Sequence, residues 1–482
     1  MTKTDMRIAA TIGRRAAACT AVGLVIVLSF TIGARADEID TKPTAKRPAI
    51  KTNRWQEDWF VLANPALRTE PLDRLKYVPL NPADPQSYVS FGATVRERFE
   101  SNGAPSFGVG GVTHDSYLLQ RAQIHADFHF NDNWQFFTQL DDIRAFGKES
   151  VGGADQDRAD LGLAFLAYNQ DFDSGTFKAR VGRQDFAFDL QRFVSSRDGP
   201  NVRQSFDAIW ADWESGPWRF IGFVSQPVQY RDDKAFDDLS RSDFRFSTLR
   251  VERQVFGENE LSVYYSLYQR DDAHYLDASG DEQRHILDAR FAGAAQGFDW
   301  DIEAMGQAGT VGSKDIRAWA GGVRAGYTFE NVDWTPRIGI QTDIASGDSR
   351  SSDDTVGTFD PLFPNGYYFS QSGYTGYTNL VHLKPSITVK PTADLTLMGA
   401  VGMLWRQTTN DAVYVQPNIP VAGTAGRGGL WTGAYLQARA DYAFNANVKG
   451  ALEVVHYDAG KSLRRAGGHD SNYLGAELKF SW

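Results

Sequence analysis

From residue 88 to its carboxyl end, the sequence alternates apolar and polar residues in segments of about 10 residues, and this pattern constrains the fold most. Within residues 116–130, Leu118 and Ile124 share one face of an expected strand, whereas Arg121 and His125 share the other. Successive side chains of a strand point to opposite sides of a sheet. Each segment therefore has one apolar face and one face that tolerates charge, which predicts an all-β protein.

Eighteen segments follow this pattern, and Gly, Asn, Asp or Pro bounds each of them. They lie near residues 88–100, 116–130, 134–144, 160–169, 175–184, 205–213, 218–225, 243–253, 260–269, 284–293, 298–307, 316–328, 334–344, 380–390, 394–406, 430–444, 447–457 and 472–482. Every second connection is short, such as residues 131–133, and the intervening ones are longer, up to residues 345–379. This rhythm predicts a transmembrane antiparallel β-barrel of about 18 strands, with short periplasmic turns and long extracellular loops.

A soluble β-sandwich also alternates apolar and polar residues and is the main alternative to a barrel. The number of hairpins and the short-then-long rhythm of the connections favour the barrel. The one cysteine of the 482 residues, Cys19, lies in a segment expected to be removed, so an exported sandwich would have no disulfide. The net charge of -10 argues against nucleic-acid binding.

The amino terminus has the features of a secretory signal peptide at residues 1–36. Basic residues precede an apolar run at residues 16–33, and Ala34-Arg35-Ala36 forms a small-residue cleavage site. A single membrane anchor is the alternative. Residues 37–86 are expected to form a periplasmic amino-terminal linker with a short helical or irregular part, and residues 87–482 the barrel in the outer membrane.

If the apolar face meets lipid, the polar face lines the lumen. Residues expected there are Arg96, Arg98, Arg121, His125, Arg290, Arg324, Arg337, Arg406 and Arg439. Arginine presents a planar fork of donors that suits carboxylates, so the pore is expected to attract anions. Alternatively, arginine and acidic residues neutralise one another across the lumen. Strict alternation puts Arg183 on the lipid side, unless a bulge resets the phase there.

Catalytic motifs are absent from the sequence: it has no H-E-x-x-H, no P-loop and no G-x-S-x-G. The acidic pairs at residues 232–233 and 237–238 offer oxygen ligands for calcium but lack the spacing of a defined calcium loop. We therefore expect neither an enzyme nor a metal or cofactor. A barrel-bound lipase or glycan lyase stays the alternative from the enzyme class.

Four separated blocks, in order, resemble the bacterial alginate export family of outer-membrane proteins. They are WQEDWFVLANP…LKYVPL with YVSFGATVRERFE, then VGRQDFAFDLQRFVSSRDGPNVRQSFDAI, then ASGDSRSSDD…GTFDPLFPNGYY, and LWRQTTNDAVY. The resemblance implies an 18-stranded barrel that secretes a negatively charged polysaccharide through an arginine-rich conduit occluded at rest. Its motifs point to Arg96, Arg98, Arg183, Arg192, Arg203, Asp207, Arg406 and Asp411.

Our first hypothesis is a passive outer-membrane channel that exports or conducts an alginate-like anionic polysaccharide. A general porin for small anionic solutes is the runner-up. A surface glycan-binding or adhesion protein would use the aromatic loop 345–379, although we favour a plug or lid there. Expected partners are outer-membrane lipid, the anionic cargo and the barrel-assembly machinery, which would engage the carboxyl-terminal strand. The resemblance suggests a monomer.

Overall fold

The computed structural model describes residues 47–482 except 112–113 and 257–258, and the described residues belong to one compact unit. The described residues do not include the expected signal peptide, residues 37–46 of the expected linker, or residues 257–258 between the expected strands near 243–253 and 260–269.

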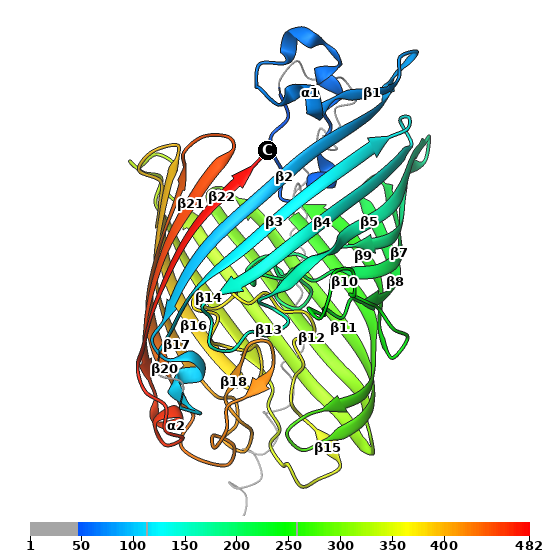
Figure 1. Cartoon of the computed structure of the whole chain (residues 1–482). Coiled ribbons are helices and arrows are strands. Elements are labelled where there is room, and N and C mark those ends of the chain that lie inside the picture. The colour runs from blue at the N-terminus through cyan, green and yellow to red at the C-terminus, as the bar shows by residue number, and fades with distance from the viewer. Residues whose placement is uncertain (1–46, 112–113, 257–258) are drawn as a thin grey trace, which may run out of the picture. The chain divides into compact units, whose positions relative to one another are not determined.

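The unit is built around one closed antiparallel sheet (Figure 1). The sheet has 20 strands, of which β1 and β15 are short additions, so 18 strands form the wall. The wall strands are β2 (Asp84–Asn102), β3 (Asp115–His129), β4 (Trp134–Phe146), β5 (Asp157–Phe172), β6 (Gly175–Gln184), β7 (Phe206–Ser215), β8 (Trp218–Pro227), β9 (Phe244–Phe256), β10 (Asn259–His274), β11 (Ser279–Ala295), β12 (Phe298–Val311), β13 (Lys314–Thr328), β14 (Arg337–Ala345), β16 (Leu380–Val389), β17 (Leu395–Trp405), β20 (Trp431–Ala443), β21 (Val448–Ala459) and β22 (Ser471–Ser481). Each neighbour in the chain order is also a neighbour in the wall, and β22 pairs with β2 to close it. A closed barrel leaves no strand edge without hydrogen bonds, which is what a membrane core requires.

The expected strands and their faces are confirmed. Each of the 18 alternating segments overlaps one wall strand. On β3, the side chains of Leu118 and Ile124 are exposed on the outside, whereas Arg121 and His125 are buried inside. The apolar side chains point outward because they are most stable in contact with lipid, while the charged side chains form polar contacts in the lumen.

Large aromatic side chains are exposed beside the short turns. They include Phe130, Trp134, Trp218, Phe298, Phe329, Trp334 and Phe444. Amphipathic rings favour the headgroup region of a membrane, so these residues mark one interface of the barrel with the bilayer.

The connections alternate less regularly than the sequence predicts. On the long-loop side, residues 275–278 and 312–313 are short connections. Here the prediction of long loops is wrong, because β10 to β13 extend further and their register stays paired almost to the turn, as at Val311 opposite Lys314. The long connections are therefore 103–114, 147–156, 185–205, 228–243, 346–379, 406–430 and 460–470.

Short elements surround both ends of the barrel. At the short-turn end lie the 3-10 helices η1 (Arg54–Gln56), η2 (Phe60–Ala63) and η3 (Pro65–Leu67), helix α1 (Asp73–Lys76) and strand β1 (Val78–Asn81), which pairs with β2. The loops at the other end contain η4 (Pro105–Gly108), β15 (Thr355–Val356), β18 (Tyr414–Val415), β19 (Ile419–Pro420) and α2 (Lys461–Arg464). No helix among the described residues has the length and apolarity to cross a membrane.

Candidate pore and its plug

Two loops fold into the lumen and fill part of it; together we call residues 185–205 and 346–379 the plug. Loop 185–205 reaches from one wall to the other, because Arg121 of β3 bonds to Asp198 and Arg192 bonds to Asp301 of β12. In the second loop, the Tyr374 hydroxyl bonds to Ser471 of β22. Loop 345–379 thus lies where a plug or lid was expected. The sequence did not predict that loop 185–205 also lies in the lumen.

The plug is held by an apolar core inside the lumen. Phe193 packs edge-on against Phe359 and Tyr377 at 5.4 and 5.1 Å between ring centroids, which joins the two plug loops. Phe363, which is 2% exposed, packs against Phe206 of the wall. Further inward-facing aromatic residues of the wall that belong to this core are Phe223, Phe246, Tyr264 and Tyr268. Side-chain packing therefore fills the space between the plug and strands β7 to β10 at this level.

Two carboxylates of the plug are held by arginines of the wall. The Arg121 Nη1 atom lies 2.6 Å from Asp198 Oδ1, and Arg96 donates to the Asp198 carbonyl at 2.8 Å. Asp189 accepts two bonds of 2.6 Å from Arg250. Paired donors match the two oxygens of a carboxylate, so Arg250 forms a built carboxylate site of the wall, which Asp189 of the plug occupies.

At Arg192 the roles are reversed, because the arginine belongs to the plug and its carboxylate partners belong to the wall. Its Nη1 atom lies 2.5 Å from Asp301 and 2.6 Å from Glu303, both on β12, and its Nε donates to Tyr368 of the second plug loop. Arg192 is 1% exposed, so its positive charge is stabilised by these partners and not by water. Arg192 thus ties the two plug loops to each other and to the wall.

Most of the other predicted arginines of the lumen are also paired with carboxylates. Arg98 bonds to Glu100, Glu453 and Glu477 at 2.6, 2.5 and 3.2 Å. The remaining pairs are Arg203 with Asp185, Arg290 with Asp301 and Glu260, Arg337 with Asp299, and Arg439 with Asp441 and Glu453. This arrangement agrees with the alternative in which acidic residues neutralise the lumenal arginines.

Arg324 and His125, like Arg406, have no carboxylate partner among the described residues. Arg324 bonds to the Gln341 side chain at 3.3 Å and lies over the ring of Tyr368. His125 is buried and stacks on Phe137 at 5.4 Å between ring centroids. The structure brings Arg324 toward the plug and places His125 in wall packing.

Arg183 and Asp207 lie away from the lumen. They pair with each other at 3.0 Å on neighbouring strands, and they share the outward parity of Val181 and Ile209. No bulge resets the phase between β6 and β7, so strict alternation gave the correct face for Arg183. Ser240 donates to Asp207 at 2.6 Å, and loop 228–243 therefore completes this pair at the rim. Lining the pore is not the role that this position supports.

Arg406 and Asp411 organise the loop between β17 and β20. Arg406 is 2% exposed and donates only to backbone carbonyls, which belong to Thr409, Asp411, Thr424, Arg427 and Gly429. Asp411 accepts bonds from the Thr358 and Tyr414 hydroxyls. Both residues are fixed in loop structure, so their position supports a stabilising role.

Two cavities remain between the plug and the short-turn mouth. The first has a volume of about 540 Å³, and its charged lining residues are Arg96, Arg98, Asp185, Asp198, Arg439 and Glu477. The second has a volume of about 420 Å³ and is lined by charged residues that include Lys178, Arg180, Asp189, Arg219, Arg250 and Glu260. Both cavities combine positive and negative side chains, and plug residues supply part of the negative charge.

Residues 52–56 form one wall of these cavities, although the sequence predicted only a linker here. Arg54 anchors the segment through bonds to Thr94 of β2 and to the carbonyl of Trp482 at 3.1 and 2.7 Å. The Arg180 guanidinium lies between the rings of Trp55 and Trp210, at 4.4 Å from each centroid. The compact run of aromatic and charged residues at 54–60 was the signal for this contact.

The closed barrel, its lipid-facing apolar surface and its charged lumen define an outer-membrane channel protein. The family model described as "Alginate export" matches residues 87–477, and the chain belongs to this family. Among curated protein sequences, none is significantly similar to this chain.

Solved outer-membrane proteins share the fold. Acinetobacter baumannii OccAB1 is 11% identical over 85% of this chain and 99% of its own, with a TM-score of 0.56. Pseudomonas aeruginosa OpdO is 12% identical over 84% and 98%, with a TM-score of 0.55. P. aeruginosa OccK2 (OpdF), solved in complex with glucuronate, is 13% identical over 82% and 98%, with a TM-score of 0.53. These identities establish a common fold only.

Proposed function

We propose that this outer-membrane channel conducts carboxylate-bearing saccharides, and that the plug must move before a long anionic polysaccharide can pass. One observation carries the proposal: wall arginines hold two plug carboxylates. Arg250 binds both oxygens of Asp189, and Arg121 binds one carboxylate oxygen and the backbone carbonyl of Asp198. An arginine site that binds an aspartate side chain also suits a uronate carboxylate. When the plug withdraws, Arg121 and Arg250 lose these carboxylates and Arg96 loses the plug carbonyls that it binds, so their donors become available to the cargo. Arg250 keeps Glu252 of its own strand as a partner at 2.6 Å.

Transport requires sites that bind weakly and repeatedly. The arginines that we assign to the cargo lie on the neighbouring strands β2 and β3 and on β9, which is separated from β3 by five strands of the wall. Several modest carboxylate contacts allow a polymer to advance because each contact can be released separately. We propose conduction without catalysis, and a family name that refers to alginate export favours a uronate-rich polysaccharide as the cargo.

Uptake of small anionic solutes is a second candidate, and the cavities favour it. Volumes of about 540 and 420 Å³ are in the range of small-ligand sites, and they exist with the plug in place. A monomeric uronate would fit beside Arg98 and Arg439 without removal of the apolar plug core. The two candidates differ in whether the plug has to leave.

Conductance of the refolded mature protein in a planar bilayer tests the proposal. We expect chloride to be favoured over potassium in the open state, and uronate oligomers to block the current. Arg121→Gln and Arg250→Gln should weaken this block, while Arg317→Gln, at an exposed position, should leave it unchanged. Cation selectivity, or equal block in all variants, would reject the proposal.

A permeation assay separates the two candidates. Liposomes that contain the protein are exposed to glucuronate, and then to uronate oligomers of increasing length. Swelling with the monomer only, with oligomers acting as blockers, supports uptake of small solutes. Entry of oligomers after deletion of part of loop 346–379 supports a polysaccharide conduit.

A further inference from the structure

The barrel wall has an interruption near the long-loop rim, where loop 228–243 replaces missing strand pairing. Strand β6 ends at Gln184 and pairs with β5 only from Ala164 onward, so the start of β5 has no β6 neighbour. Loop 228–243 crosses to this part of β5. The backbone N–H groups of Asp237 and Asp238 donate to Asp160 Oδ2 at 2.8 and 3.2 Å.

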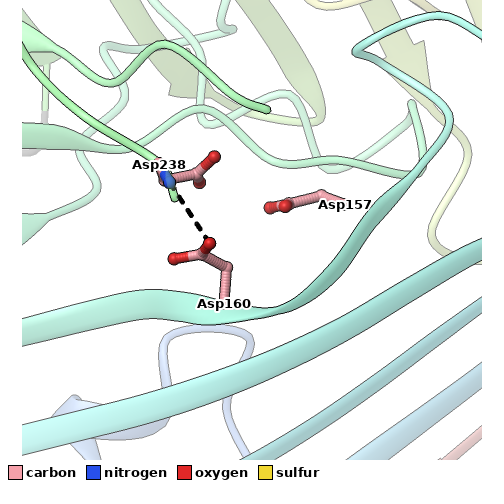
Figure 2. Close-up of side chains that lie close together, drawn as sticks. All are labelled: Asp157, Asp160 and Asp238. Carbon is pink, nitrogen blue, oxygen red and sulfur yellow. Dashed lines mark hydrogen bonds between the residues drawn. The ribbon is translucent and has the colours of Figure 1, made fainter. Parts of the chain in front are cut away.

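Three carboxylates converge at this crossing (Figure 2). Asp157 and Asp160 come from β5 and Asp238 from the loop, and one oxygen of each lies within 4.8 Å of the others. Asp157 is 4% exposed and Asp160 is 2% exposed. The carboxylate of Asp157 points toward the other two in Figure 2.

Asp157 supplies an independent indication of a missing ligand. Its Oδ1 atom is shielded from solvent, and it accepts no hydrogen bond from any described residue. A buried carboxylate oxygen without a partner is costly, because burial removes hydration and nothing replaces it. A group that accepts a lone pair from this oxygen would satisfy it.

No lysine or arginine side chain in the described part of the chain forms an ion pair with Asp157, Asp160 or Asp238. The nearby cations are used elsewhere: Arg183 pairs with Asp207, and Arg158 pairs with Asp232. The three carboxylates thus have no lysine or arginine ion-pair partner among the described residues.

We propose that Asp157, Asp160 and Asp238 bind a divalent cation of the calcium type. Calcium takes six to eight oxygen ligands in flexible geometry, so three carboxylates with carbonyls and waters form a suitable set. Bound calcium would fasten loop 228–243 to β5 where the wall lacks β6. The same loop contacts the base of the plug, because Val228 donates to the Ser205 carbonyl at 3.0 Å and Tyr230 bonds to the Ser205 N–H at 2.6 Å.

Calcium binding by the full mature protein tests this site. The protein is refolded in detergent without lipopolysaccharide, stripped with EDTA and titrated with CaCl₂ by calorimetry, with MgCl₂ as the comparison. We expect saturable binding of a single calcium ion per chain. Asp157→Asn should weaken it by at least about tenfold, because the amide keeps the shape and removes the charge. Asp272→Asn, on a side chain that is 86% exposed, is the matched control and should bind as the wild type does.

Thermal unfolding distinguishes loss of the calcium site from a folding defect, because a folding defect would lower the melting temperature in EDTA. In EDTA, Asp157→Asn should melt at or above the temperature of the wild type, because one of three repelling charges is gone. Added calcium should raise the melting temperature of the wild type and leave that of Asp157→Asn unchanged. The proposal is overturned if the wild type binds no calcium saturably, or if Asp157→Asn binds it as tightly.

Discussion

Asp198 in the plug and Arg121 in the wall form an ion pair whose Oδ1 and Nη1 atoms are 2.6 Å apart. Arg121 is 2% exposed and also donates to the carbonyls of Asp198, Pro200 and Asn201. All the donors of this arginine are therefore directed to one turn of the plug. The contact positions loop 185–205 against β3 and withholds a carboxylate-binding group from the lumen.

Asp198→Asn should make the plug open more often. The amide keeps the size of the side chain but removes the charge that Arg121 holds. Because the Asp198 side chain is 40% exposed, water screens the pair, and we expect a loss of about 1 kcal/mol, or roughly fivefold in the ratio of open to closed channels. Single-channel recording measures this ratio. Asp354→Asn, in an exposed part of loop 346–379, is the control and should not change it.

Phe363→Ala should loosen the plug and leave the barrel intact. Phe363 contacts Phe206 and Phe246 of the wall at centroid distances of 5.0 and 5.2 Å, so its removal leaves a cavity where the plug meets the wall. Buried Phe→Ala substitutions cost about 3–5 kcal/mol. We expect faster cleavage of loop 346–379 by trypsin or chymotrypsin and larger mean conductance.

The barrel itself reports whether Phe363→Ala acts locally. Its heat-modifiable mobility on gels should match that of the wild type, since the wall strands keep their hydrogen bonds. Phe236→Ala, at a side chain that is 64% exposed, should alter neither cleavage nor conductance. Equal cleavage rates in Phe363→Ala and wild type would contradict the role of this residue.

The strands of the wall were predictable from the sequence because the alternation of apolar and polar residues that defines them is local. A strand between lipid and water must alternate, so Leu118, Ile124, Arg121 and His125 reveal their faces within one short segment. The same rule placed Arg183 outward correctly. It failed for the connections 275–278 and 312–313, because strands can extend beyond the membrane as paired hairpins that carry mixed residues.

The plug was only partly predictable because its contacts are distant in sequence. The density of aromatic residues in loop 345–379 indicated a packed segment. Loop 185–205 has no comparable density of aromatic residues, and Arg192 pairs with Asp301, which is 109 positions away in the sequence. Charges also mislead: Arg406 resembled a pore residue by type, and only its carbonyl partners show that it holds a loop.

Arg406→Ala should destabilise residues 406–430 and leave ion selectivity unchanged. The substitution removes the donors for five backbone carbonyls, among them those of Thr424 and Arg427 at 2.6 Å each. Each buried acceptor left without a partner costs about 1–3 kcal/mol, so we expect at least about 3 kcal/mol locally. Hydrogen exchange over the loop measures the effect, and Arg317→Ala is the exposed control. A clear shift in chloride-to-potassium selectivity would show instead that Arg406 acts in the pore.

Lys76 should make the docking of the amino-terminal segment depend on pH. Burial, followed by the nearby charge of Arg54, lowers the pKa of Lys76 from 10.5 to about 7. Its Nζ atom lies between the rings of Trp59 and Trp482, at 4.9 and 4.8 Å from their centroids, and it has no hydrogen-bond partner among the described residues. The folded state therefore binds the proton less tightly than the unfolded state does.

Stability of this segment should rise between pH 7 and 10.5, because the unfolded state then binds more protons than the folded state. The slope is at most about 1.4 kcal/mol per pH unit, and below pH 7 the full penalty is present. Lys76→Met should remove this dependence and increase protection near neutral pH, since the apolar side chain needs no proton there. Hydrogen exchange over residues 54–77, corrected for the intrinsic pH dependence of exchange, measures both effects. The exposed Lys51→Met is the control, and a Lys76→Met profile that still rises with pH would assign the dependence to another group.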